Sequence, residues 1–215
     1  MNEDSVILVD KPAGITSFGV VARVRRRLSE QLGKKAKVGH TGTLDPFATG
    51  LMIIVTGKEC RNAMSYSKLD KEYEATFRLG YTSSTGDPEG ELTAVSDLQP
   101  SQEAIETALQ RFRGEITQRP PIFSAIKING RRAYDLARNG EVFEIPERQV
   151  TVFSLELLDY NYPDIRIRTH VSSGTYIRSL AVDIGAVLET GAYCVELRRT
   201  KVAAFDVADA IRIEV

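Results

Sequence analysis

The sequence predicts an α+β fold, in which a mixed and mainly antiparallel sheet is flanked by helices. Apolar segments with the two-residue period of strands are interspersed with segments of helical period, and the two kinds do not alternate as regular βαβ units. The chain has 215 residues, of which 42% are hydrophobic, and it shows neither an internal repeat nor a low-complexity linker. These observations favour a single domain that spans residues 1–215.

The first elements follow from short-range patterns. Residues 6–9 are apolar and stop at an Asp-Lys-Pro turn, which predicts a strand. Residues 17–32 are expected to form a helix closed by Gly33, because an apolar side chain recurs at every fourth position. These positions are Val20, Val24, Leu28 and Leu32. Residues 51–55 form a continuous apolar run, which is typical of a central strand covered on both faces.

The middle of the chain contains a half-buried strand and a second helix. Residues 71–80 alternate, which predicts a strand with one apolar face formed by Tyr73, Ala75, Phe77 and Leu79. Residues 82–90 are rich in Ser, Thr, Gly and Pro and are expected to form a loop. After Pro100, with Ser101 as N-cap, apolar residues at helical spacing predict an amphipathic helix. They are Ile105, Ala108, Leu109 and Phe112.

The last part of the chain is less regular at first. Within residues 119–140 we expect a short β-like piece at 124–128, an Asn129-Gly130 turn and a short basic helix. Residues 165–171 alternate like a strand, and residues 172–175 turn the chain into a helix from about 176 to 189.

Composition and charge narrow the class of function. The formal net charge is −1, which argues against a domain that coats nucleic acid by charge alone. No apolar run approaches the roughly 20 residues of a membrane-spanning helix, and the acidic Glu3 and Asp4 argue against a signal peptide. Cys60 and Cys194 are far apart and lack metal-binding spacing. We therefore expect a cytoplasmic protein with reduced cysteines and no structural zinc.

Basic residues nevertheless gather in two clusters. A solvated helix face explains such a run as well as a binding surface does. The first cluster is Arg23, Arg25, Arg26, Arg27, Lys34, Lys35 and Lys37, and the second is Arg131 and Arg132.

The stretch "GHTGTLDPFATG", residues 39–50, is the most constrained part of the sequence. Asp45 is its only carboxylate, and Pro46 biases the backbone of Asp45 towards extended conformations. A loop of this kind presents a side chain rigidly, as a nucleophile or a general base requires. Asp-Pro is also a common turn initiator, so the loop by itself leaves a structural role for Asp45 open.

A second candidate is "SSGTYIRSL", residues 172–180, in which Arg178 falls in the first turn of the expected helix. An arginine beside a buried aspartate lowers the pKa of that carboxyl and fixes its orientation. Taken alone, Arg178 is better explained as a surface residue, and His40 and Tyr73 as structural ones. With two histidines, no nucleophile elbow and no phosphate-binding glycine loop, the sequence predicts carboxylate chemistry without metal or cofactor.

The chain resembles the TruB-type tRNA pseudouridine synthases, because five of its segments match successive motifs of that family in the family's order. They are "LVDKPAGITS", "GHTGTLDPFATGLMII", "DKEYEATFRLG", "SAIKINGRRAYDLARNG" and "SSGTYIRSLAVDIG". The resemblance runs from about residue 6 to residue 205, and the second motif is highly specific to this family. It implies the pseudouridine synthase fold with a central RNA-binding cleft.

The resemblance also implies an activity, the conversion of uridine to pseudouridine in the T-arm loop of tRNA, at position 55 in tRNA numbering. The target base must first be turned out of its stack. Asp45 would be the nucleophile, and the sequence leaves open whether it attacks C6 of the base or C1′ of the ribose. Either route detaches uracil, rotates it and rejoins it through C5. The product is an isomer, so no cofactor and no metal is expected.

Other roles follow from positions in the matched motifs. Tyr73 matches the tyrosine that stacks on the flipped base and is a candidate to take the C5 proton. Arg178 matches the arginine that pairs with the nucleophile, which completes a catalytic set with Asp45 and Tyr73. His40 matches a histidine that helps to hold the RNA in its flipped-out geometry. Two further residues match substrate-pocket positions of the family: Tyr176 and Leu197.

Residues 119–148 resemble the flexible segment that grips the T-arm. Lys127, Arg131 and Arg132 would contact RNA phosphates, which position RNA without reading its sequence. Many members of the family continue into a small RNA-binding domain of the PUA type, and we expect a short form without it. We also expect a monomer, because no long exposed apolar heptad indicates otherwise.

Two alternatives stay open at this point. One is an RNA-binding helper of tRNA folding that keeps the scaffold but makes little product. The other is a synthase that acts on ribosomal or guide-directed RNA. The presence of Asp45, Tyr73 and Arg178 together argues against a pure binder, which has no chemical need for this set.

Overall fold

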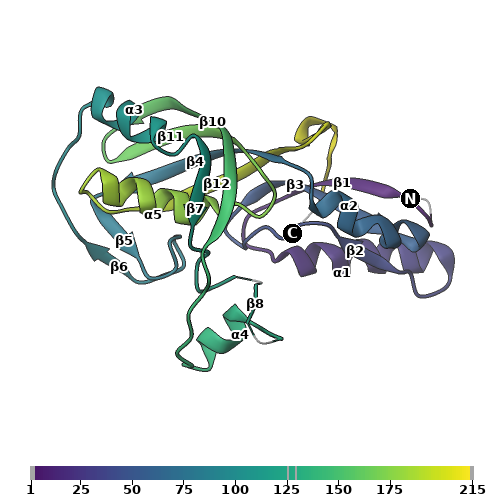
Figure 1. Ribbon diagram of the computed structural model, residues 1–215. Coiled ribbons are helices and arrows are strands. Elements are labelled where there is room, and N and C mark those ends of the chain that lie inside the picture. Colours follow the sequence, from purple (N-terminus) through teal and green to yellow (C-terminus); the bar gives the residue numbers. More distant parts are fainter. Residues whose placement is uncertain (1–2, 125, 129, 214–215) are drawn as a thin grey trace. The chain divides into compact units, whose positions relative to one another are not determined.

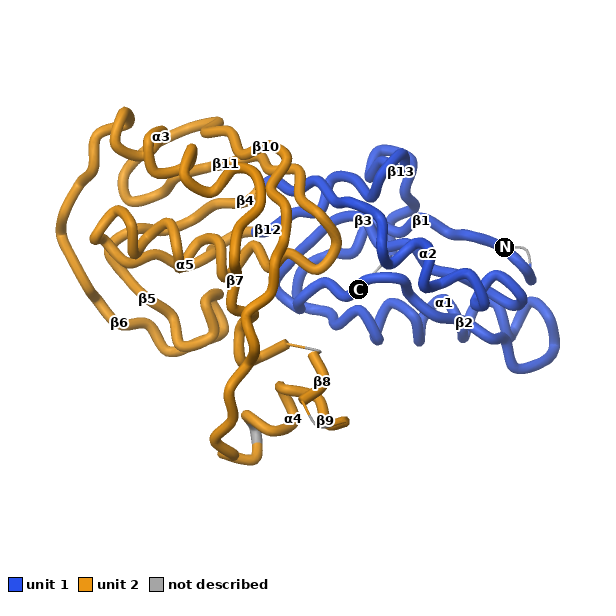
Figure 2. Tube along the Cα trace, in the orientation of Figure 1, with its two compact units in different colours: residues 1–74, 197–215 blue, residues 75–196 orange. Residues whose placement is uncertain are grey.

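The computed structural model describes residues 3–124, 126–128 and 130–213. They form two compact units, shown in different colours in Figure 2. Unit 1 comprises Met1–Glu74 and Leu197–Val215, and unit 2 comprises Ala75–Glu196. The chain passes from one unit to the other within two strands, β4 (Lys71–Leu79) and β12 (Ala192–Val202). The mixed sheet and its flanking helices confirm the predicted α+β class (Figure 1).

The central strand of unit 1 is β3 (Thr49–Thr56), which is buried along nearly its whole length, as its apolar run predicted. It pairs antiparallel with β1 (Val6–Lys11) and parallel with β12. Three short strands extend this part of the sheet: β2 (Val38–His40) beside β3, β13 (Phe205–Asp206) beside β12, and β14 (Ile211–Arg212) beside β1.

The main helix of unit 1 is α1 (Ser17–Leu32), within the predicted bounds. The side chain of Thr16 caps its first turn by accepting a hydrogen bond from the amide of Gly19, and Gly33 ends it with a φ of 64°, which suits glycine. The short elements η1 (Gly57–Asn62), α2 (Ala63–Ser67) and η2 (Val207–Asp209) complete the unit. Alternate residues of β3 form a core cluster with Val202, namely Leu51, Ile53 and Val55.

Unit 2 is built on antiparallel strands. β10 (Arg148–Asn161) pairs with β11 (Asp164–Val171) on one side and with β7 (Gly114–Gln118) on the other. The helix α3 (Gln102–Gln110) is capped by Ser101 as predicted and packs against β10, and α5 (Ile177–Val187) packs against α3. The predicted strand face of β4 is buried at all four apolar positions.

The structure differs from the sequence-based expectation in several elements. The segment expected to be a loop at 82–90 is flanked by a hairpin of β5 (Tyr81–Ser83) and β6 (Leu92–Ala94). The long strands β10 and β12 were not predicted. A small arm projects from unit 2 and contains β8 (Lys127–Ile128), β9 (Arg131–Arg132) and α4 (Ala133–Arg138) (Figure 1). Asn129 of the predicted turn lies outside the described residues.

The structure also bears on the expectations for the cysteines and for membrane-spanning helices. Cys60 and Cys194 are free thiols. In the described part of the chain, no helix is long and apolar enough to cross a membrane.

Candidate active site

Asp45 lies half-buried in the loop between β2 and β3, and its preceding residue is fixed to α1. The hydroxyl of Ser17 donates to the carbonyl of Leu44 and accepts from the amide of Leu44, each at 2.8 Å. The carbonyl of Asp45 itself accepts from the amide of Ala48 at 3.2 Å, which closes a turn within the loop. The backbone on the N-terminal side of the carboxylate is therefore held by the first residue of a helix.

The residue after Asp45 is held just as firmly. The carbonyl of Pro46 accepts from the amide of Gly14 at 2.9 Å and from Nζ of Lys11 at 3.1 Å. Lys11 is fully buried, and its ammonium also donates to the carbonyls of Pro12 and Ile15, both at 2.9 Å. A buried charge is tolerated where it is hydrogen-bonded in this way. Lys11 thus ties the turn after β1 to the loop of Asp45.

Three other predicted site residues belong to unit 1 with Asp45. His40 is the last residue of β2 and pairs with Ile54 of β3. Tyr73 lies on the buried face of β4, and Leu197 is a buried residue of the neighbouring strand β12. These three residues thus lie on strands of one sheet.

Arg178 belongs to unit 2, where it is almost fully buried near the start of α5. Its Nη1 donates to the carbonyl of Thr85 at 2.7 Å and lies 3.1 Å from the carboxylate of Asp87, while its Nη2 donates to the carbonyl of Phe123 at 2.8 Å. These contacts fix the plane of the guanidinium. Its expected pairing with Asp45, a residue of unit 1, stays a prediction.

Asp87 contacts the predicted site residue Arg178, and the sequence did not single it out. Oδ1 of Asp87 accepts from the hydroxyl of Thr85 at 2.6 Å and from the amide of Glu89 at 3.0 Å, and Oδ2 faces Arg178. The composition of its loop indicated only a turn, and a single Asp among Ser, Thr, Gly and Pro gives no signal of burial. Its buried ion pair with Arg178 is visible only in the folded chain.

Tyr176, the second predicted site residue of unit 2, is oriented by two residues that the sequence did not single out. The buried amide of Gln118 accepts from the backbone N–H of Tyr176 at 2.8 Å and donates to its carbonyl at 3.0 Å. The guanidinium of Arg148 lies 4.8 Å from the centre of the Tyr176 ring, a cation–π geometry. A side chain at Gly174 would lie 3.4 Å from that guanidinium, so the glycine leaves room for it.

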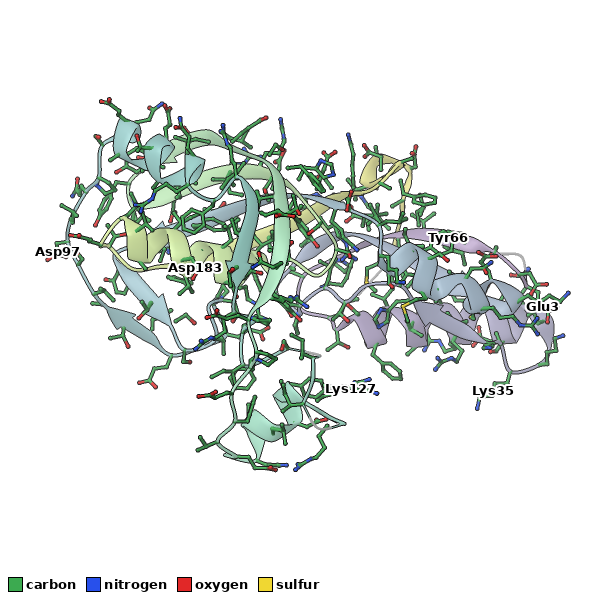
Figure 3. The ribbon with its side chains drawn as sticks, in the orientation of Figure 1. Glu3, Lys35, Tyr66, Asp97, Lys127 and Asp183 are labelled. Atoms are coloured by element: carbon green, nitrogen blue, oxygen red, sulfur yellow. The ribbon has the colours of Figure 1, made fainter. Side chains whose placement is uncertain are left out.

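The structure places all three predicted RNA-contacting residues on the small arm of unit 2. Lys127 pairs with Arg132 across the β8–β9 hairpin, and Figure 3 shows the Lys127 side chain extending outward from it. Arg131 donates to both oxygens of Glu141, at 2.9 and 2.7 Å. Arg132 donates to the hydroxyl of Tyr134 at 2.7 Å. Lys127 therefore presents its charge to solvent, whereas that of Arg131 is engaged within the arm.

The geometry supports carboxylate chemistry at Asp45. A nucleophilic carboxylate needs a backbone that cannot drift, and both neighbours of Asp45 are fixed by hydrogen bonds. Among the residues that the structure describes, no group of three or more His, Cys, Asp or Glu side chains is arranged to hold a metal ion.

Comparison with known protein families shows which family the chain belongs to. Residues 26–177 match the family model of the TruB family pseudouridylate synthase N-terminal domain, and residues 178–215 match that of the tRNA pseudouridylate synthase B C-terminal domain. The chain belongs to the TruB family. The resemblance inferred from the five sequence motifs is confirmed.

Similar TruB proteins cover nearly all of this chain. It is 47% identical over 214 residues to tRNA pseudouridine synthase B of Phocaeicola vulgatus, which covers 99% of this chain and 91% of that protein. It is 44% identical over 211 residues to the protein of the same name from an Azoarcus species, with 98% and 69% covered. The Francisella tularensis protein of that name is 42% identical over 216 residues, with 100% and 70% covered.

Solved structures confirm the pseudouridine synthase fold of this TruB chain. A chain in the crystal structure of a Cbf5–Nop10–Gar1 complex matches with a TM-score of 0.75 and 31% identity, covering 98% of this chain and 53% of that one. This chain therefore spans about half the length of that match. A crystal structure of a pseudouridylate synthase shares the fold at 14% identity, with a TM-score of 0.52 and 99% and 69% covered.

Proposed function

We propose that this TruB-family protein isomerises uridine to pseudouridine at position 55 in the T-arm loop of tRNA, with Asp45 as its nucleophile. Its relatives carry the name tRNA pseudouridine synthase B, which supports uridine in tRNA as the substrate. The observation that best supports Asp45 as the nucleophile is that its backbone is fixed on both sides. The hydroxyl of Ser17 holds the residue before it, and the ammonium of Lys11 holds the residue after it.

The reaction balances without any added reagent. Asp45 attacks either C6 of the base or C1′ of the ribose, the bond between C1′ and N1 breaks, and uracil rotates in the pocket. A bond then forms between C1′ and C5, the carboxylate is released, C5 loses its proton, and N1 gains one. Because product and substrate are isomers, the carboxylate is regenerated at the end of each cycle.

The remaining site residues would hold the flipped nucleotide and the nucleophile. Tyr73 would stack on the base, which is worth about 1–3 kcal/mol for a base on an aromatic ring. His40, Tyr176 and Leu197 would line the path of the flipped nucleotide. Arg178 would pair with Asp45 and keep it ionised, with its own orientation fixed by Asp87.

The arm would close on the RNA backbone. Lys127, Arg131 and Arg132 would supply positive charge to phosphates of the T-arm stem, which accounts for a basic arm in a chain whose net charge is −1. We further propose that the protein works as a monomer in the cytoplasm.

The test uses a T-arm stem-loop transcript with tritium at uridine C5, in the presence of a chelator. Pseudouridine formation releases this tritium to water. We expect release by the unaltered protein and a loss on the order of 10⁴-fold in Asp45→Asn, because a nucleophile is removed. Asp97→Asn is the matched control, since Asp97 is an exposed aspartate of a surface segment and should leave the rate unchanged.

Binding of the same transcript separates the alternatives. Asp45→Asn that binds RNA but makes no product supports the enzyme. Unaltered protein that binds and refolds tRNA without releasing tritium would overturn the proposal in favour of the folding helper. Release from a ribosomal or guide-paired RNA but not from the T-arm would reassign the substrate.

A further inference from the structure

Arg199 on β12 is 2% exposed, and each nitrogen of its guanidinium donates to a different backbone carbonyl. Nε bonds the carbonyl of Leu51 at 2.7 Å, Nη2 that of Gly42 at 3.2 Å, and Nη1 that of Thr43 at 3.4 Å. Gly42 and Thr43 lie just before Asp45, and Leu51 is the third residue of β3, the strand that follows the loop. One side chain therefore bridges the two ends of the segment that carries the nucleophile.

The backbone of Arg199 also approaches β3 closely, just after the loop. Arg199 is the register partner of Gly50 in the parallel pairing of β12 with β3. Gly50 has a φ of 104°, and a Cβ at this position would lie 2.8 Å from the amide nitrogen of Arg199 and closer still to its carbonyl oxygen. Glycine permits both this backbone conformation and this close approach. The backbone of Arg199 thus fixes the chain after the loop, at Gly50. Its side chain binds the chain on both sides of Asp45.

The guanidinium of Arg199 binds backbone carbonyls and forms no ion pair with a described carboxylate. In the described part of the chain, Arg199 has no carboxylate within salt-bridge distance, and backbone carbonyls are its only acceptors. A buried cation without a counter-ion is costly, so its hydrogen bonds must offset that cost. Three carbonyls in different directions match the planar fork of arginine, whereas the ammonium of lysine is a compact point charge.

The charge of Arg199 also reaches a neighbouring group. Lys71, two residues before Tyr73, has its pKa lowered to about 8, mainly by burial and secondly by the positive charge of Arg199. Arg199 therefore places a positive charge near β4, the strand that carries Tyr73.

We infer that Arg199 is a positioning residue for Asp45, a clamp that fixes the catalytic loop by binding the carbonyls of Gly42, Thr43 and Leu51. The inference rests on the proposed role of Asp45 as nucleophile. Without the clamp, three carbonyls lose their donor and the loop can drift, and a misplacement of about 1 Å at a reacting group costs on the order of 100-fold in rate. Arg199 does not touch the substrate, so RNA binding should be spared.

The experiment compares Arg199→Met and Arg199→Lys with the unaltered protein in single-turnover tritium release at saturating enzyme. We expect Arg199→Met to lower the rate constant about 10- to 100-fold while the Kd for the T-arm stem-loop changes less than about 3-fold. Arg199→Lys should recover part of the rate, since an ammonium can bond one or two of the three carbonyls. Hydrogen exchange at the amides of residues 41–50 is measured in parallel and should become faster in Arg199→Met.

A control variant tests whether a loss of stability alone would slow the reaction. Leu28 is a fully buried residue of α1 that takes no part in the hydrogen bonds of Arg199, so Leu28→Ala should cost about 2–5 kcal/mol in free energy of unfolding without slowing the reaction. If Arg199→Met reacts at the unaltered rate, or loses rate only as much as Leu28→Ala does, the inference is wrong. If the unaltered protein makes no pseudouridine, the proposed function fails, and the exchange rates alone then decide: faster exchange in Arg199→Met supports the clamp, and unchanged exchange overturns it.

Discussion

Nη1 of Arg178 lies 3.1 Å from Oδ2 of Asp87, and the two side chains are only 3% and 6% exposed. The other oxygen of Asp87 is occupied by Thr85 and by the amide of Glu89. The backbone carbonyls of Thr85 and Phe123 take further donors of the guanidinium. Arg178 is therefore oriented from within unit 2 before any contact with Asp45 or with RNA is considered.

The first prediction concerns this ion pair. Asp87→Asn removes the negative charge that faces the buried guanidinium of Arg178 within unit 2. Removing one partner of a buried pair typically costs about 3–5 kcal/mol in free energy of unfolding. Urea unfolding should show that loss, and single-turnover tritium release should slow because Arg178 loses one of the contacts that orient it.

A second ion pair of unit 2 serves as its control. Arg78 donates to both oxygens of Asp164, at 2.8 and 2.7 Å, but the two side chains are 38% and 34% exposed. Asp164→Asn should therefore cost no more than about 1 kcal/mol and leave the reaction rate alone. Equal losses of stability or of rate in the two variants would contradict the role assigned to Asp87.

The elements that were predicted from the sequence are those whose side chains keep a strict period. α1 and α3 keep one apolar stripe, and β4 alternates without interruption, so their bounds agree with the prediction to within a residue or two. β10 was missed because its register shifts between Val152 and Ser154 and again between Leu157 and Asp159, which breaks the alternation. β5 and β6 are short and largely exposed, so burial imposes no pattern on them.

For the site, the matched motifs located residues that touch or flank the proposed chemistry, and they missed the residues behind them. Gln118, Arg148 and Arg199 lie in segments with no turn, cap or period that marks them, and each acts by contacts with residues distant in the sequence. A charged residue is not expected at a buried position, so the presence of Arg199 argues against predicting a buried strand at β12. Long-range partners of this kind are decided by the fold.

The second prediction tests the close approach at Gly50. Gly50→Ala adds a Cβ against the backbone of Arg199 at a φ of 104°, so both the clash and the strain oppose folding. We expect a loss of at least about 3 kcal/mol in free energy of unfolding and a disturbed catalytic loop.

Gly33→Ala separates strain from clash. Gly33 also has a positive φ, 64°, but nothing lies within 4 Å of a Cβ built there. Its replacement should cost only about 1 kcal/mol, as for an L-residue in a left-handed helix cap. Comparable thermal unfolding of the two variants would show that the contact with Arg199 is not tight.

The third prediction concerns the charge of the arm. Glu141 engages both Nη atoms of Arg131, and the hydrogen bond from that arginine lowers the pKa of Glu141. Glu141→Gln should release Arg131 for a phosphate, which raises the affinity for a T-arm stem-loop and steepens the fall of log K with log salt by about 1.

Lys127→Gln should act in the opposite direction, because Lys127 is already exposed. The salt slope should become shallower by about 1, and the loss should be similar for stem-loops of different sequence. Titrations by fluorescence anisotropy between 50 and 200 mM salt, a window in which several phosphate contacts are resolved, give both slopes. A salt dependence that neither variant alters would place the RNA contacts outside the arm.

The fourth prediction follows from Lys71, whose pKa is lowered to about 8 by burial and then by the charge of Arg199. Its ammonium donates to the carbonyls of Ser67 and Leu69. In the unfolded chain the pKa of this lysine returns to its ordinary value near 10.5. Between about pH 8 and 10.5 the unfolded state thus holds more protons on Lys71 than the folded state, and the free energy of unfolding contributed by this group rises with pH.

Lys71→Met removes that linkage. The stability of the unaltered protein relative to Lys71→Met should increase as the pH is raised from 8 to 10, and the difference should level off below about pH 7, where Lys71 is largely protonated in both states. Lys201→Met is the control, because Lys201 is 42% exposed and faces Glu72 at 3.7 Å. Urea unfolding at closely spaced pH values measures the three curves. If unaltered protein and Lys71→Met ran parallel across this window, the lowered pKa of a buried Lys71 would be contradicted.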